Sequence, residues 1–257
     1  MLHPSFVYGG TFYPDTAAEA DSRLIITTVC YDQRVRVWLL SMNAEGKCDA
    51  EMCISEMNIM DKPEGAGKYE QKQGLYEDDI IDDAALQLIV NPNGNRKNVN
   101  GVSKGSSANE FGQTCFDYVH PNCLVYNANG RLFVGDSRGY ISVWDVNIRQ
   151  GNLYVDNFFQ IRQKELEGDE INQLIVHPEN ENKLFVHSRD NCIRLLEYES
   201  MKGPRIRKRF FGAKCKDLMI RSAVSPDGQF LVAGSEDGTP HVWDVTSGDA
   251  YGPKTTR

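Results

Sequence analysis

The chain has 257 residues, of which 40% are hydrophobic and 25% charged, and its formal net charge is -8 at pH 7. This length allows a sizeable buried core, and the acidic balance argues against the general phosphate-binding surface of a nucleic-acid-binding protein. The seven cysteines form no CxxC pair, and no apolar run approaches the roughly 18 residues of a membrane span, so we expect a soluble, cytoplasmic chain with reduced thiols.

The first strand signals occur near the N-terminus. Segments rich in β-branched residues, or with alternating apolar residues, predict strands at 6–12, 23–30, 34–40 and 51–57. A tight turn at Tyr31-Asp32-Gln33 joins the second strand to the third. These segments predict a first unit of four antiparallel strands.

The pattern breaks between about 58 and 117. An acidic run at 77–83 is followed by a polar tract at 91–112 that is dominated by Asn, Gly, Ser and Lys. Such composition cannot bury enough apolar area to offset ordering entropy, so we expect a flexible insertion. The segment 85–94 resembles 171–178, and it is an alternative strand that would compete with 122–126.

Three similar units follow the insertion. Strands are predicted at 122–126, 131–134, 140–145 and 158–162, then at 171–176, 183–187, 191–197 and 205–211, and finally at 220–224, 229–234 and 239–245. Trp144, Leu196 and Trp243 recur at a spacing of about 50 residues near the end of each third strand, close to the ~40–45 residues of a WD40 blade. The sequence therefore predicts an all-β, partial WD40 propeller of four or five blades.

Polar residues recur at fixed places in these units. In WD40 blades a Trp, a turn Asp, a hydroxyl and a His form one hydrogen-bonded network that satisfies otherwise buried polar groups. The candidates for this structural network are His3, Thr28, Asp32, Trp38, Trp144, Asp190, Ser235, Asp237 and Trp243. The same residue types suit catalysis, but an active site would occur once, whereas this set repeats. We therefore predict no enzyme activity.

No pattern indicates a metal or cofactor. The other four histidines, His120, His177, His187 and His241, show no HxH or HExxH spacing, and no Gly-rich loop opens a helix. The basic residues Arg205, Arg207, Lys208 and Arg209 lie on the predicted outermost strand of the third unit. Charges there protect an exposed sheet edge, and the alternative is docking of an acidic partner or a phosphoinositide head group.

Several stretches resemble the WD40 region of the Jouberin family. They are the HPSFVY opening at 3–8, the CYD turn at 30–32, the FGA segment at 211–213 and AGSEDG at 233–238, in matching order over most of the chain outside the insertion. The resemblance implies a scaffold in cilium assembly at the basal body and transition zone, which would act through contacts with other proteins.

The resemblance also sets an expectation about completeness. Jouberin-family proteins carry about seven repeats with flanking coiled-coil sequence and, in animals, an SH3 domain, so we expect this chain to be a fragment. The alternative function is a generic WD40 adaptor in RNA processing, or a substrate receptor of a ubiquitin ligase.

Overall fold

The computed structural model describes residues 3–14, 23–43, 45–60, 70–73, 118–149, 152–201 and 203–251. Within these ranges the regular elements are β-strands, and no helix is long and apolar enough to cross a membrane. Residues up to 74 and from 119 onward belong to one compact unit. The acidic run at 77–83 and the alternative strand at 85–94 lie outside the described residues, so both interpretations stay predictions.

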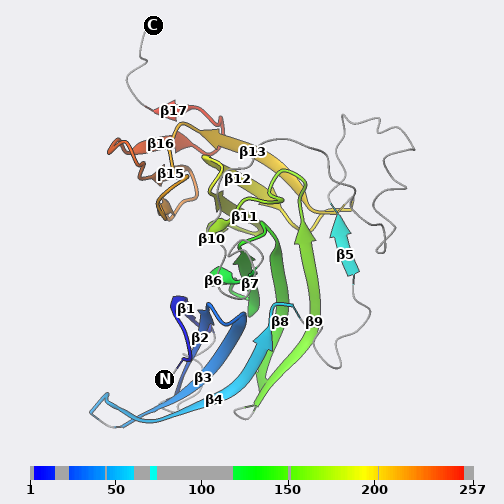
Figure 1. Cartoon of the computed structure of the whole chain (residues 1–257), viewed down its shortest axis with the longest axis vertical. Helices are drawn as coiled ribbons and strands as arrows, with labels where there is room; N and C mark the ends of the chain where they lie inside the picture. Colours follow the sequence, from blue (N-terminus) through cyan, green and yellow to red (C-terminus); the bar gives the residue numbers. More distant parts are fainter. Residues whose placement is uncertain are drawn as a thin grey trace, which may run out of the picture. The chain divides into compact units, whose positions relative to one another are not determined.

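The strands form four sheets, each built on four consecutive antiparallel strands (Figure 1). The first sheet contains β1 (Val7–Phe12), β2 (Arg23–Cys30), β3 (Arg34–Met42) and β4 (Cys48–Asn58). The second contains β6 (Pro121–Tyr126), β7 (Arg131–Asp136), β8 (Ile141–Arg149) and β9 (Asn152–Arg162). The third contains β10 (Ile171–His177), β11 (Asn180–Ser188), β12 (Cys192–Glu197) and β13 (Arg205–Phe211), and the fourth contains β14 (Ser222–Val224), β15 (Phe230–Ala233), β16 (His241–Asp244) and β17 (Ala250–Tyr251).

This arrangement confirms the predicted all-β propeller. The first strands of successive sheets are neighbours, because β1 contacts β6, β6 contacts β10 and β10 contacts β14. Two strands were not predicted. One is β17, and the other is β5 (Glu70–Gln73), which pairs in parallel with β9 as a fifth strand of the second sheet. Part of the predicted insertion therefore forms a strand.

Apolar side chains fill the spaces between successive sheets. Consecutive residues of a strand point to opposite faces, so Leu132 and Val134 of β7 join the cluster shared with the first sheet, whereas Phe133 joins the cluster shared with the third. All three side chains are fully buried, and each such burial stabilises the fold by roughly 1.5–3 kcal/mol. Because both faces of the middle strands are buried between sheets, these strands are almost continuously apolar.

Polar side chains join the first strands of the third and fourth sheets. Gln173 on β10 donates from Nε2 to the carbonyl oxygen of Ser222, at 3.0 Å, and accepts the Ser222 N–H at 2.7 Å. Arg221 donates to the carbonyl oxygen of Asn172 at 2.8 Å. The Gln173 amide thus supplies the hydrogen bonds that a neighbouring strand would make.

The loop between β9 and β10 packs directly on the β7–β8 turn. Gly139 in that turn has φ of +84°, and a Cβ atom there would lie 1.7 Å from the carbonyl oxygen of Leu166. The Gly168 N–H donates to the carbonyl oxygen of Arg138 at 2.9 Å. Only glycine combines this backbone conformation with so close an approach.

Candidate functional site

Predicted network residues of the first sheet come together where β1, β2 and β3 meet. The Trp38 indole N–H donates to Thr28 Oγ1 at 2.9 Å, and the same hydroxyl lies 3.2 Å from His3 Nε2. Asp32 reaches this group indirectly, because Arg36 donates to the Asp32 carboxylate and lies 3.4 Å from His3 Nδ1. Both Trp38 and Thr28 are buried, so these bonds satisfy polar groups inside the fold.

Arg36 is the central cation of this group, and its role was not predicted. It is 5% exposed, with its NH2 nitrogen 2.6 Å from Asp32 Oδ2 and its Nε 2.7 Å from Glu56 Oε1. Burial alone would raise the pKa of Asp32, but the hydrogen bonds from Arg36 and Cys30 and the Arg36 charge together outweigh it and hold that pKa below its usual range. Burial, followed by the Arg36 charge, lowers the pKa of His3. The imidazole is therefore held towards its neutral form.

An arginine–aspartate pair also occupies the third sheet. Arg194 stands two residues before Leu196, just as Arg36 stands two residues before Trp38. It pairs with Asp190 at 2.5 Å and also donates to Ser188 Oγ at 2.8 Å. The recurrence of arginine at this offset is a sequence signal that could have identified both pairs.

The second sheet carries an arginine–aspartate pair at shifted positions. Arg138 occupies the turn place where the first and third units have aspartate, and it lies 2.7 Å from Asp136. Asp136 is 1% exposed, and its Oδ1 also accepts the N–H groups of Arg138 and Tyr140. The turn therefore also contains a carboxylate paired with an arginine, although Ser142 occupies the place that Arg36 and Arg194 hold in the other two sheets.

The two other tryptophans make different contacts from Trp38. Trp144 is fully buried, and its Nε1 has no acceptor among the described residues. The equivalent of Thr28 in this sheet is Val134, which has no hydroxyl. Trp243 donates instead to the carbonyl oxygen of Phe211 at 3.1 Å. The predicted network is thus assembled around Trp38 and not around Trp144 or Trp243.

Ser235 and Asp237 of the last sheet lie in its β15–β16 turn. Ser235 Oγ accepts the Lys214 N–H at 2.9 Å, and Asp237 Oδ1 accepts the Thr239 N–H at 3.1 Å. The hydrogen bond from Ser235 lowers the pKa of Asp237. These contacts stabilise the turn, and within the described part of the chain neither side chain hydrogen-bonds Trp243.

The predicted docking residues lie on β13, the outermost strand of the third sheet, and several of them make contacts within the fold. Arg207 pairs with Glu197 on the neighbouring strand, and Arg209 pairs with Glu165 of the β9–β10 loop. Lys208 Nζ donates to the carbonyl oxygen of Thr246, while Arg205 also has a partner. The strand edge is therefore charged, and much of that charge is compensated internally.

The remaining histidines are dispersed among aromatic contacts and the core. His120 stacks on Tyr8, His177 on Phe185 and His241 on Trp243, and burial lowers the pKa of His187 to about 4. Among the residues described, no three His, Cys, Asp or Glu side chains are grouped to hold a metal ion.

Comparisons with known proteins agree with this architecture. The WD domain, G-beta repeat family matches residues 212–244. The chain is 25% identical to Jouberin of Mus musculus over 254 residues, which is 97% of the chain and 18% of Jouberin. It is 25% identical to Denticleless protein homolog A of Xenopus laevis over 120 residues, covering 45% of the chain and 16% of that protein.

Solved structures show the same fold. The chain matches a structure titled "Crystal structure of an active polycomb repressive complex 2 in the basal state" with a TM-score of 0.52 and 12% identity, covering 93% of this chain and 37% of that one. This chain thus carries a WD40 repeat, resembles Jouberin over nearly its whole length, and spans about a fifth of that relative.

Proposed function

We propose that this WD40 propeller region, similar to Jouberin, serves as a non-catalytic scaffold for protein contacts. One observation carries the proposal. The side chains of His3, Thr28 and Asp32, whose residue types also occur in active sites, form hydrogen bonds or ion pairs with one another, Trp38 and Arg36 within the first sheet. A propeller presents the turns between its strands to partners on a rigid frame, so binding needs no reactive group.

The cellular setting that we propose is cilium assembly at the basal body and transition zone, with proteins of those structures and of the associated cytoskeleton as partners. The similarity to Jouberin extends over 97% of the chain, which supports this setting more than a match to one repeat would. Because the chain covers 18% of Jouberin, the proposal concerns the contacts of this region alone.

The alternative is a generic WD40 adaptor in RNA processing or ubiquitin ligation. The local similarity to Denticleless protein homolog A fits an adaptor of this general kind. That match covers 45% of the chain, so it carries less weight than the longer Jouberin match.

Affinity capture can separate the two functions. The tagged full chain is expected to retain basal-body and transition-zone proteins from ciliated cells and to lose them in matched non-ciliated cells. A tagged unrelated propeller controls for capture by the fold alone. Retention of the same RNA-processing or ubiquitin-ligase components from both cell types would favour the adaptor instead.

The basic residues of β13 provide a second variant for the same assay. Arg207 is 44% exposed, so Arg207→Gln removes an accessible charge at the cost of an exposed ion pair, worth about 1 kcal/mol or less. If β13 docks an acidic partner, capture of that partner falls while the unfolding midpoint hardly changes. Unchanged capture would restrict β13 to its role as a protected sheet edge.

A further inference from the structure

A polar cavity of about 410 Å³ is lined by residues of the first three sheets. Its walls come from Tyr13 after β1, the β6–β7 turn, β8, β9, the start of β11 and the residues that follow β12. The volume falls within the range of ligand pockets, about 300–1,000 Å³, but such pockets are mostly apolar. Here Val146 is the single aliphatic residue of the lining, so the occupant should be polar.

The lining carries an excess of negative charge. Four carboxylates, from Asp145, Asp156, Glu181 and Glu199, face one cation, Arg131. Arg131 Nε lies 2.5 Å from Asp145 Oδ1, and Arg131 also pairs with Glu199, so both of those carboxylates have a basic partner. Two carboxylates of the cavity are left without a basic partner among the described residues.

Those two carboxylates belong to different strands. Asp156 on β9 is exposed and makes no hydrogen bond or ion pair with any described residue. Glu181 on β11 accepts a hydrogen bond from the Asn129 side-chain amide, a neutral donor. A cation that entered the cavity would therefore meet carboxylates that no basic side chain of the described residues neutralises.

Arg131 shows how this cavity accommodates a guanidinium. Besides its two carboxylate partners, its guanidinium carbon lies 5.7 Å from the ring centroid of Phe159 and 5.7 Å from that of Tyr198. Carboxylates and ring faces together favour cations. Tyr198 and Tyr13 both line the cavity, so aromatic surface accompanies the uncompensated acids.

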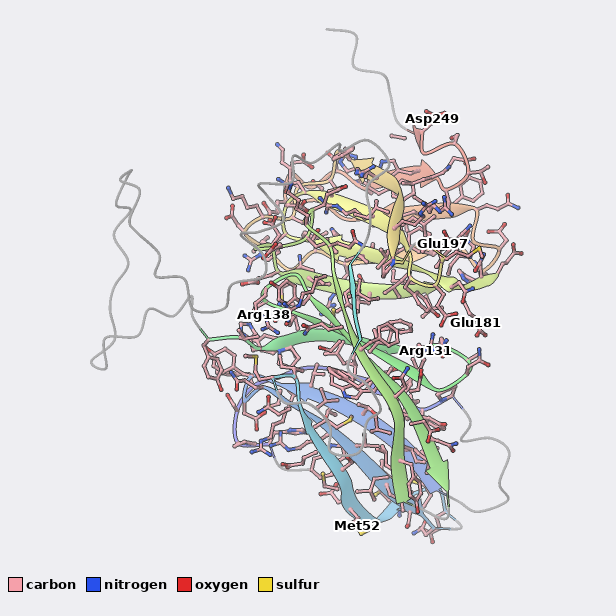
Figure 2. The ribbon with its side chains drawn as sticks, turned by 90° about the vertical axis from the view of Figure 1, so that its right-hand side faces the viewer. Met52, Arg131, Arg138, Glu181, Glu197 and Asp249 are labelled. Atoms are coloured by element: carbon pink, nitrogen blue, oxygen red, sulfur yellow. The ribbon has the colours of Figure 1, made fainter. Side chains whose placement is uncertain are left out.

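We propose that the cavity receives a basic side chain of a partner polypeptide, held by Asp156 and Glu181. This rests on the proposed function as a protein scaffold and adds the chemistry of one contact. The side-chain amides of Asn129 and Asn182 are exposed at the cavity, where they can hydrogen-bond the partner's backbone. In Figure 2, Arg131 and Glu181 lie close together, whereas Asp249 lies at the far end of the last sheet.

The test is a ¹H–¹⁵N NMR titration of the full chain with the probe Ac-Gly-Ser-Arg-Ser-Gly-NH₂. We expect saturable shifts at the amides of Asn129, Asn147 and Glu181, and affinity at least about tenfold weaker for the isosteric peptide with citrulline in place of arginine. The double variant Asp156→Asn, Glu181→Gln should weaken arginine-peptide binding about tenfold, because two attractive contacts are lost. Raising the salt concentration to about 1 M should also weaken it.

Asp249→Asn is the matched control, since it removes one exposed carboxylate that does not line the cavity. It should leave the affinity unchanged. Equal binding of the arginine and citrulline peptides, shifts confined to other sheets, or full affinity in a folded double variant would each overturn the proposal.

Peptide titration and capture of cellular partners, both carried out on the wild-type chain, separate the two hypotheses. If arginine peptides do not bind but ciliary partners are still retained, the cavity proposal fails and the scaffold function stands. If the peptides bind but no ciliary partner is retained, the cavity proposal stands and the ciliary function fails.

Discussion

Replacing Thr28 by valine tests the hydrogen bonds around Trp38 directly. The two side chains are similar in volume, so the change removes a hydroxyl without opening a cavity. Thr28 is 8% exposed and Trp38 is 7% exposed, so water cannot readily replace the lost acceptor of the indole N–H. The variant leaves a buried donor unpaired and also removes the contact with His3.

The expected cost follows from that unpaired donor. Leaving one buried polar group unsatisfied costs about 1–3 kcal/mol. We expect Thr28→Val to lower the free energy of unfolding by about 2 kcal/mol, which corresponds to a fall in Tm of roughly 4–8 °C at this chain length. Equilibrium urea unfolding, followed by tryptophan fluorescence and circular dichroism, measures the change.

The second sheet supplies the reciprocal variant. Val134 pairs with Ser142 as Thr28 pairs with Arg36, and Trp144 Nε1 lacks an acceptor among the described residues. Val134→Thr should supply that acceptor and stabilise the chain by about 1 kcal/mol. If Thr28→Val is neutral while Val134→Thr is destabilising, the reasoning from buried indole N–H groups is refuted.

Two further predictions concern the third sheet and the turns. Arg194→Met should cost about 3 kcal/mol at neutral pH because it leaves the largely buried Asp190 unpaired, whereas Arg207→Met at an exposed pair should cost about 1 kcal/mol or less. Burial favours a raised pKa for Asp190, but hydrogen bonds from Arg194 and Ser188 lower that pKa. The ionised Asp190 therefore stabilises the fold above about pH 4, and this stabilisation is lost as the pH falls through the pKa of Asp190 in the folded state. Urea unfolding across this range should show the wild-type advantage over Arg194→Met shrinking at acid pH, and a constant advantage would contradict the assignment. Gly139→Ala should lower the free energy of unfolding by more than about 3 kcal/mol, because the added Cβ meets a backbone oxygen. Gly238→Ala, at φ of +78° in open space, should lower it by about 1 kcal/mol. Equal shifts in Tm for the two variants would refute the steric argument.

Local pattern predicted most of the strands because each follows from nearby residues. Alternating or continuous apolar runs and turn residues are properties of a few neighbouring positions. Strand β17 escaped prediction because Ala250–Tyr251 is too short to show a period, and β5 escaped because its polar sequence forms a strand by pairing with β9. Pairing with a distant strand leaves no signal within four residues.

The candidate site was likewise predicted only in part from the sequence. The places of His3, Thr28, Asp32 and Trp38 were predicted from spacing, and the structure brings them into one group in which Asp32 acts through Arg36. The buried role of Arg36 was missed because a charged residue on an alternating strand is ordinarily expected to face solvent. Its burial depends on carboxylates from Asp32 and Glu56, which lie on different parts of the chain.

The sequence by itself determined the repeating unit, its strands and turns, and the resemblance to a WD40 region. Tertiary structure alone decided which Trp N–H finds an acceptor, how the arginines are neutralised, and how Asp145, Asp156, Glu181 and Glu199 converge on one cavity with Arg131. The reason is physical: strand period and turn chemistry are local, whereas hydrogen-bond satisfaction and charge balance depend on side chains that strand pairing and the stacking of sheets bring within a few ångströms.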